Sequence, residues 1–175
     1  VENASLAEIQ QALAEGRVTS SALTRAYLAR IEACDRAGPG LNAVREVNPD
    51  ALAIAASLDG RKPGKRQPLA GVPILVKDNI ATGDEQSTTA GSLALDGARA
   101  VADATVVKRL RAAGAVILGK ANLTEFANIL TIDMPAGYSS LGGQVKNPYA
   151  PQLGQHGIPI VPPGGSSSGS AVAVA

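Results

Sequence analysis

Residues Gly71-Val-Pro-Ile-Leu-Val-Lys-Asp-Asn-Ile80 contain the pattern on which the fold prediction depends. Residues 72–76 form a compact apolar run of strand length, and residues 115–118 form a second such run. Between the two runs, Asp103 can cap a helix and Gly114 can end it. Two strands that bracket a helix predict a right-handed crossover and a parallel pair. We therefore expect an α/β fold in which helices flank a mixed β-sheet that contains both runs.

Two helices are predicted near the N-terminus. Ser5-Leu-Ala-Glu8 has the spacing of a capping box, apolar residues follow at helical intervals, and Gly16 ends the pattern. Thr19 or Ser20 can cap a second helix, which Gly38-Pro39-Gly40 interrupts. We expect these helices to pack against each other and on the sheet.

The connecting segments give further expectations. Residues 43–47 have the composition of a short strand, and Pro49 fits the first turn of a helix that continues through residues 51–58. Asn122-Leu-Thr-Glu125 again has capping-box spacing and predicts a short helix. Residues 135–170 are rich in Gly, Pro, Ser and Asn, and an irregular segment of this length inside a domain is often functional.

The chain is predicted to be a single incomplete domain. Its 175 residues are 45% hydrophobic and 18% charged, which is typical of a globular domain. Residues 1–60 would form an N-terminal helical region, and residues 69–175 would begin the α/β core. Residues 171–175 are apolar and contain nothing that closes a helix, so we expect the sequence to be interrupted within a core element.

The charge balance limits the choice of partner. Lys and Arg number 16 and Asp and Glu number 15, which gives a formal net charge of +1 and excludes a strong overall attraction to nucleic acid or an anionic membrane. The basic cluster Arg61, Lys62, Lys65 and Arg66 has no nearby aromatic side chain on which a base could stack, so we interpret it as a solvated loop. We expect a small neutral substrate, and neither a nucleic-acid nor a membrane partner.

The single cysteine and the single histidine argue against other chemistries. Cys34 excludes an intrachain disulfide, and a nitrogen and sulfur metal site would have only His156 and Cys34 to draw on. A Ser-His-Asp triad would depend on His156 in one mobile loop, and we disfavour it. We expect no metal and no cofactor.

No signal-peptide pattern opens the chain and no apolar run approaches about 20 residues, so we expect a cytoplasmic protein.

Two features of the sequence have both a structural and a catalytic interpretation. Lys77 directly follows an apolar strand, so it is either a surface lysine with a buried stem or a desolvated lysine that can act as a base. Pro162-Pro-Gly-Gly-Ser-Ser-Ser-Gly-Ser-Ala171 is either a linker or a loop whose backbone N–H groups form an anion-binding concavity. The second segment lacks the Gly-Lys-Ser/Thr ending of a phosphate-binding P-loop.

The order of motifs along the chain resembles the amidase signature family, which comprises Ser-cis-Ser-Lys amidases. Residues 71–80 and Gly164-Gly-Ser-Ser-Ser-Gly-Ser-Ala171 are similar to the two leading motifs of that family. Between them, Thr88-Thr-Ala-Gly-Ser92, Gly119-Lys-Ala-Asn-Leu-Thr-Glu-Phe126 and Asn147-Pro148 follow in the family's order. The resemblance covers nearly the whole chain and implies the N-terminal part of the amidase signature fold.

The resemblance also implies a role for particular residues. Lys77 matches the catalytic lysine, Ser166 matches the bridging serine, and Ser167 matches the neighbouring serine that helps to orient the lysine. The bridging serine follows a cis peptide bond in the family, which makes Gly165 a supporting residue here. A serine hydroxyl needs a base, and a neutral lysine reached through a second hydroxyl can supply one. Holding Lys77 half neutral near pH 7 costs about 4–5 kcal/mol, so we expect Lys77 to be buried.

The resemblance further implies hydrolysis of a carboxamide in a small molecule or peptide through an acyl-serine intermediate. The family's nucleophilic serine belongs to a later glycine-serine motif, which residues 1–175 do not contain, so we expect these residues alone to be inactive and to require the missing C-terminal part. Two alternatives stay open, an ammonia-generating subunit of an amidotransferase and a non-catalytic binding module. Ser168 and the apolar run after it favour the peptide-amidase branch, whereas residues 149–163 form a longer link than is usual.

Overall fold

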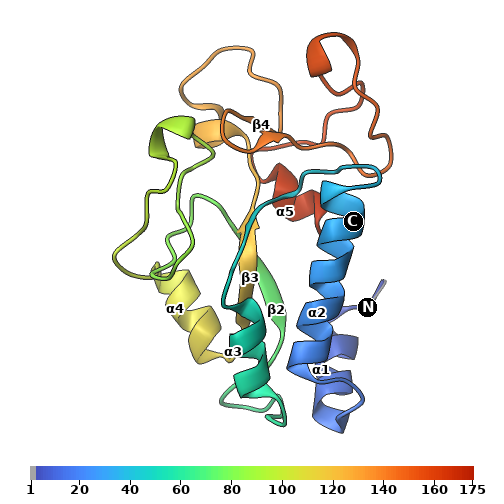
Figure 1. Cartoon of the computed structure of the whole chain (residues 1–175), viewed down its shortest axis with the longest axis vertical. Helices are drawn as coiled ribbons and strands as arrows, with labels where there is room; N and C mark the ends of the chain where they lie inside the picture. The colour runs from blue at the N-terminus through green and yellow to red at the C-terminus, as the bar shows by residue number, and fades with distance from the viewer. Residues whose placement is uncertain (1–2) are drawn as a thin grey trace.

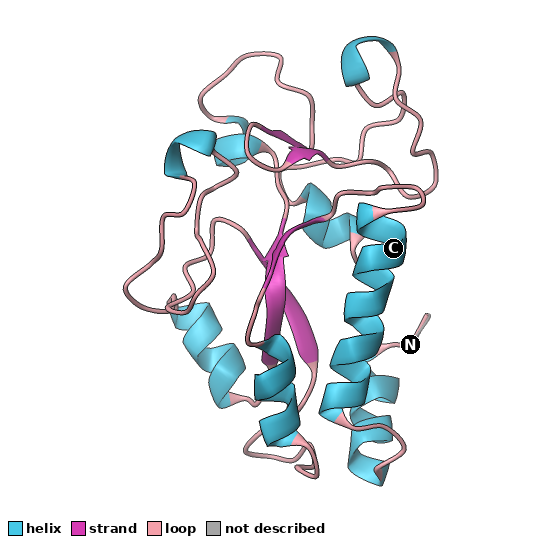
Figure 2. Ribbon diagram, in the orientation of Figure 1, coloured by secondary structure: helices cyan, strands magenta, loops and turns pink. Residues whose placement is uncertain are grey.

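The computed structural model describes residues 3–175 and shows a three-layered α/β arrangement (Figures 1 and 2). The central sheet contains β1 (Val44–Val47), β2 (Pro73–Lys77) and β3 (Val116–Ala121) in the order β1-β3-β2. Strand β2 runs parallel to β3, and β1 runs antiparallel to it. The predicted mixed sheet and parallel pair are therefore confirmed. Both β2 and β3 begin one residue later than predicted, and β3 continues to Ala121.

Successive side chains of β3 point to opposite faces of the sheet, which explains how helices come to cover both faces. Val116 and Leu118 are buried against α3 (Ala51–Leu58), whereas Ile117 is buried against Val107 of α4 (Thr105–Ala112). On the first face, Val72 also packs on the two N-terminal helices, so α1, α2 and α3 share that side. In Figure 1, α4 lies on the opposite side of the strands from α1 and α2.

The N-terminal helices begin as their sequence predicts. In α1 (Leu6–Glu15), the Ser5 hydroxyl accepts a hydrogen bond from the Glu8 amide at 3.3 Å, and the Glu8 carboxylate accepts one from the Ser5 amide at 2.8 Å. Gly16 ends the helix with a φ of 72°, a backbone conformation that suits glycine. Thr19 caps α2 (Ser20–Arg30), which continues as a π-helical segment at Ile31–Arg36.

One predicted helix is confirmed, and the predicted cap of another is wrong. Helix α3 spans residues 51–58 as predicted, with Asp50 at its N-cap and Pro49 just before the first turn. Helix α4 has Ala104 at its N-cap, because the Asp103 carboxylate instead accepts a hydrogen bond from the Gly83 amide at 2.8 Å and pairs with the Arg111 guanidinium. Contacts with distant residues thus replace the predicted local cap of α4.

The helix predicted from Asn122 is also wrong. Only a short 3-10 segment, Glu125–Asn128, forms there, and Phe126 and Ala127 within it have positive φ angles. The Asn122 side chain is buried and occupied elsewhere, because its amide nitrogen donates to the backbone carbonyls of Asn42 and Gly142, and its amide oxygen accepts from the Ser139 hydroxyl. These long-range hydrogen bonds override the local capping pattern.

The C-terminal part of the chain is mostly irregular, as predicted. It contains a small two-stranded sheet of β4 (Tyr138–Ser139) and β5 (Gly143–Gln144), a 3-10 turn at Gln155–Gly157 and the short helix α5 (Ser168–Val172). A further 3-10 turn, Leu93–Leu95, precedes α4. No helix within residues 3–175 is both long enough and apolar enough to cross a membrane.

Candidate active site

The fold brings Lys77 and Ser166 into direct contact. Lys77 is the last residue of β2, and α5 packs against that strand directly after the loop that carries Ser166 (Figure 1). The Lys77 Nζ donates a hydrogen bond to the Ser166 Oγ at 2.7 Å, although the two residues are 89 positions apart in the sequence. The predicted approach of the two side chains is therefore confirmed.

The environment of Lys77 differs in degree from the prediction. The side chain is half-buried, not buried as predicted. Burial still lowers the pKa of the Lys77 amine from its ordinary value of 10.5. Desolvation disfavours the ammonium form, which is the direction that a lysine base requires.

The backbone of the Ser166 loop is held by Thr124. The Gly165–Ser166 peptide bond is cis, as the resemblance implies. The Thr124 amide donates to the Ser166 carbonyl at 3.0 Å, while the Thr124 Oγ1 accepts from the Gly137 amide at 2.8 Å. A Cβ at position 165 would lie 2.7 Å from the Thr124 Oγ1, so the loop fits against Thr124 only with glycine at that position.

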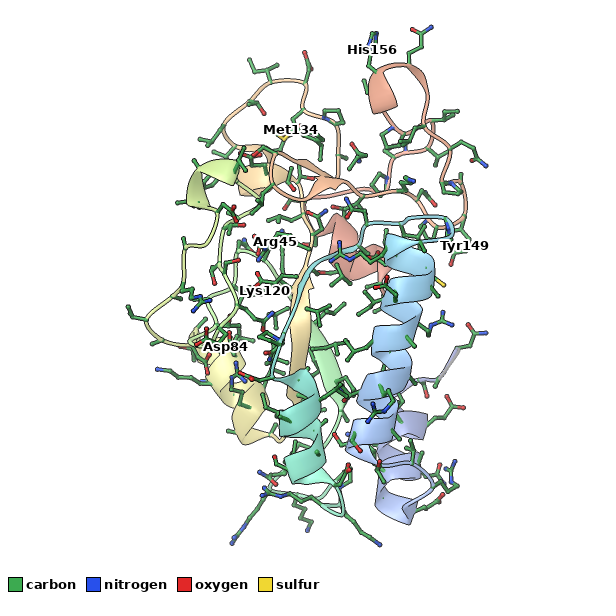
Figure 3. The ribbon with its side chains drawn as sticks, in the orientation of Figure 1. Arg45, Asp84, Lys120, Met134, Tyr149 and His156 are labelled. Carbon is green, nitrogen blue, oxygen red and sulfur yellow. The ribbon has the colours of Figure 1, made fainter. Side chains whose placement is uncertain are left out.

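The serines that follow Ser166 are in different environments. Ser167 is exposed, and its hydroxyl makes no hydrogen bond to any of residues 3–175, so the orienting role implied for it stays a prediction. Ser168, the first residue of α5, is fully buried, and its hydroxyl has no partner among the described residues. His156 lies on the loop at residues 149–163 and points away from the body of the molecule (Figure 3).

A buried charged cluster beside the site was missed by sequence reasoning. The Asp78 and Lys120 side chains are fully buried, and the Arg45 side chain is only 8% exposed. Burial lowers the pKa of Lys120 to about 8, while the negative charges of Asp78 and Asp84 oppose that shift. A usable signal was the position of Lys120, which directly continues an apolar run that ends in Leu-Gly.

The Lys120 ammonium is held by two oxygen acceptors. Its Nζ donates to the Ile80 carbonyl at 2.6 Å and to the Thr88 Oγ1 at 3.1 Å.

No cluster of three or more His, Cys, Asp or Glu side chains suited to a metal ion occurs within residues 3–175. The contact between the partly desolvated Lys77 amine and the Ser166 hydroxyl offers proton transfer between these two groups.

Comparison with known proteins places this geometry in a family. The family model named Amidase matches residues 22–175. A probable amidase of Arabidopsis thaliana is 45% identical over 178 residues, which cover 99% of this chain and 33% of that protein. A glutamyl-tRNA(Gln) amidotransferase subunit of Halorhodospira halophila is 44% identical over 172 residues, which cover 97% of this chain and 32% of that protein.

A solved structure is similar over the same part of the fold. The native peptide amidase of Stenotrophomonas maltophilia is 49% identical and superposes with a TM-score of 0.88, over 99% of this chain and 34% of that one. The chain thus spans about a third of the length of these relatives. The motif order, the α/β fold and the family match agree, and this chain belongs to the amidase family.

Proposed function

We propose that the protein hydrolyses a carboxamide to a carboxylic acid and ammonia or an amine, through an acyl-serine intermediate. The hydrogen bond of 2.7 Å between the Lys77 Nζ and the Ser166 Oγ carries the proposal, because a loop serine and a partly desolvated lysine would otherwise have no reason to meet. Family membership supports the reaction class. Residues 1–175 would form the N-terminal part of one catalytic domain.

The proposed relay transfers one net proton, first from the nucleophilic serine to Lys77 and then from Lys77 to the leaving nitrogen. The neutral Lys77 amine accepts the proton of the Ser166 hydroxyl, while the Ser166 Oγ accepts the proton of the nucleophilic serine that attacks the carbonyl carbon. When the C–N bond breaks, the Lys77 ammonium returns a proton to the Ser166 Oγ, and Ser166 passes its own proton to the leaving nitrogen. Water then hydrolyses the acyl ester by the same path. We place the nucleophilic serine, and the N–H groups that stabilise the oxyanion, outside these 175 residues.

The relatives suggest two kinds of substrate. The peptide amidase of Stenotrophomonas maltophilia, at 49% identity, supports a peptide amide as the substrate. The amidotransferase subunit of Halorhodospira halophila, at 44% identity, supports the second candidate, in which the protein releases ammonia within a larger assembly. A peptide amide is our leading proposal.

Ammonia release from a C-terminally amidated dipeptide by the full-length protein tests the proposal. Lys77→Ala and Ser166→Ala are each expected to lower kcat by roughly 10²–10⁴-fold, because general-base catalysis contributes about that much. Lys62→Ala serves as the matched control, since Lys62 is an exposed loop lysine. Near-normal turnover by Lys77→Ala would contradict the base role and leave the binding-module interpretation standing. Ammonia release only in the presence of partner subunits would instead favour the amidotransferase interpretation.

A further inference from the structure

The end of β2 is anchored through a residue that the relay does not use. Asp78 directly follows Lys77, and its side chain is fully buried in the charged cluster next to the site. Its backbone amide donates to the Ala121 carbonyl at 3.0 Å, which ties the chain after Lys77 to the end of β3. The buried Asp78 carboxylate is thus carried by the residue next to Lys77, at the point where the chain after β2 is tied to β3.

The partners of the Asp78 carboxylate come from two other segments of the chain. Its Oδ1 accepts a hydrogen bond from the Arg45 Nε on β1 at 2.5 Å. Its Oδ2 accepts from the Thr89 hydroxyl at 2.6 Å and from the Gly91 amide at 2.9 Å. One carboxylate thus joins the end of β2 to β1 and to the turn at residues 89–91. Hydrogen bonds to an ionised acceptor are about twice as strong as neutral ones.

The turn at residues 89–91 is hydrogen-bonded to the segment that holds the Ser166 loop. The Ala90 carbonyl accepts a hydrogen bond from the Phe126 amide at 3.0 Å. Phe126 lies two residues after Thr124, whose amide donates to the Ser166 carbonyl at 3.0 Å. The Asp78 carboxylate is therefore connected to both members of the relay, to Lys77 through the chain and to Ser166 through the turn and Thr124.

Arg45 compensates the charge of the buried Asp78 carboxylate. A carboxylate without solvent or a cation is strongly disfavoured, and removing one partner of a buried pair leaves the other charge uncompensated. Arg45 also donates from its Nη2 to the Ser87 carbonyl at 3.1 Å and to the Ser87 hydroxyl at 3.0 Å. The guanidinium thereby holds the same loop from its other side, and its Nη2 also pairs with the Glu46 carboxylate at 2.5 Å.

We propose that Asp78, paired with Arg45, is a positioning residue for the proposed amide hydrolysis, because it ties the Lys77 backbone and the Ser166 loop to one buried carboxylate. This inference rests on the proposed function. Asp78 touches neither substrate nor the reacting atoms, so it acts only through the distance and direction between the Lys77 Nζ and the Ser166 Oγ. A misplacement of about 1 Å in such a pair can lower the rate by about 100-fold.

The main test compares Asp78→Asn with two variants of Thr89 in the full-length protein. Asp78→Asn is expected to lower kcat by about 100-fold and to change KM by less than about 3-fold, because the geometry of the relay is altered and not the substrate contacts. Thr89→Val keeps the size of the side chain but removes the hydroxyl that donates to Asp78, and we expect kcat to fall by about 10-fold. Thr89→Ser restores the hydroxyl and should return kcat to within about 2-fold of the wild type.

Two controls separate positioning from general destabilisation. Glu85→Gln breaks an exposed pair with Arg99 in the loop that also carries Thr89, and it should leave kcat unchanged. All rates are measured well below the melting temperature of each variant, so that the folded fraction is complete. The double variant Arg45→Met/Asp78→Asn should lower kcat no further than the more impaired single variant does, because the two residues form one ion pair.

The outcomes distinguish this inference from the function on which it rests. If Lys77→Ala abolishes turnover while Asp78→Asn and Thr89→Val keep kcat within about 2-fold of the wild type, the positioning role is overturned and the proposed function stands. If Lys77→Ala retains turnover, the proposed function itself fails. If Asp78→Asn does not fold, Thr89→Val against Thr89→Ser decides, and equal kcat values for those two variants overturn the positioning role.

Discussion

Replacing Lys120 with methionine should remove a pH dependence of stability that its buried ammonium group imposes. Lys120 is fully buried, and burial lowers its pKa in the folded protein to about 8 from an ordinary value of 10.5. Between about pH 8 and pH 10.5 the unfolded chain therefore binds more protons at this residue than the folded chain does. The free energy of unfolding rises with pH wherever the unfolded state binds more protons, so Lys120 should make the protein more stable as the pH rises through this window.

The size of the effect follows from the two pKa values. The difference between about 8 in the folded protein and 10.5 in the unfolded chain corresponds to about 3 kcal/mol at 1.36 kcal/mol per pKa unit. Most of this, about 2–3 kcal/mol, is gained between pH 7 and pH 10, because the folded group is largely protonated at the lower pH and neutral at the higher one. The loss of hydrogen bonds to the Ile80 carbonyl and the Thr88 hydroxyl in Lys120→Met adds a cost to the variant that varies little with pH.

Urea unfolding of the full-length wild type and Lys120→Met at pH 7, 8, 9 and 10 measures the effect. Every other titrating group contributes almost equally to both proteins, so the difference between their unfolding free energies isolates Lys120. We expect that difference to shift in favour of the wild type by about 2–3 kcal/mol from pH 7 to pH 10. Lys62→Met, at an exposed position, should show no such shift. Two curves that stay parallel within about 0.5 kcal/mol would refute the lowered pKa of Lys120.

Two further predictions concern the relay. The value of kcat/KM should rise with pH to a midpoint below 10.5, because the base must be neutral and burial lowers the pKa of Lys77. The residual activity of Lys77→Ala should lack this rise, and an identical pH profile in the two proteins would argue against Lys77 as the base. Gly165→Ala places a Cβ 2.7 Å from the Thr124 Oγ1, so kcat should fall by about 100-fold, as measured by ammonia release beside the exposed control Gly64→Ala. Unchanged turnover would show that the Ser166 loop tolerates displacement.

The parts of the fold that depend on local pattern could be predicted from the sequence. The apolar runs predict β2 and β3 because each is short and continuous. The capping box at Ser5 is complete within four residues. Lys77 and Ser166 could be paired because the order of motifs resembles a known family, and not because either residue stands out locally. The parallel sheet then gives a physical reason for the approach, since the loop and α5 return to the end of β2.

The parts that depend on long-range contacts could not be predicted in the same way. Asp103 and Asn122 both satisfy a local capping rule, but each side chain is bound to residues far away in the sequence. The charged cluster was missed for the same reason, because Arg45, Asp78 and Lys120 come from three different elements. A charged residue on a strand predicts exposure until the partner that neutralises it is known.

The different exposures of the two lysines agree with different tasks. In the proposed relay, Lys77 exchanges its proton with the Ser166 hydroxyl, which its half-buried amine contacts at the end of β2. Lys120 has the more strongly lowered pKa, but its amine is fully enclosed and bound to the Ile80 carbonyl and the Thr88 hydroxyl, where no substrate can reach it. A lowered pKa alone would therefore select the wrong lysine as the base. The hydrogen bond to Ser166 selects Lys77.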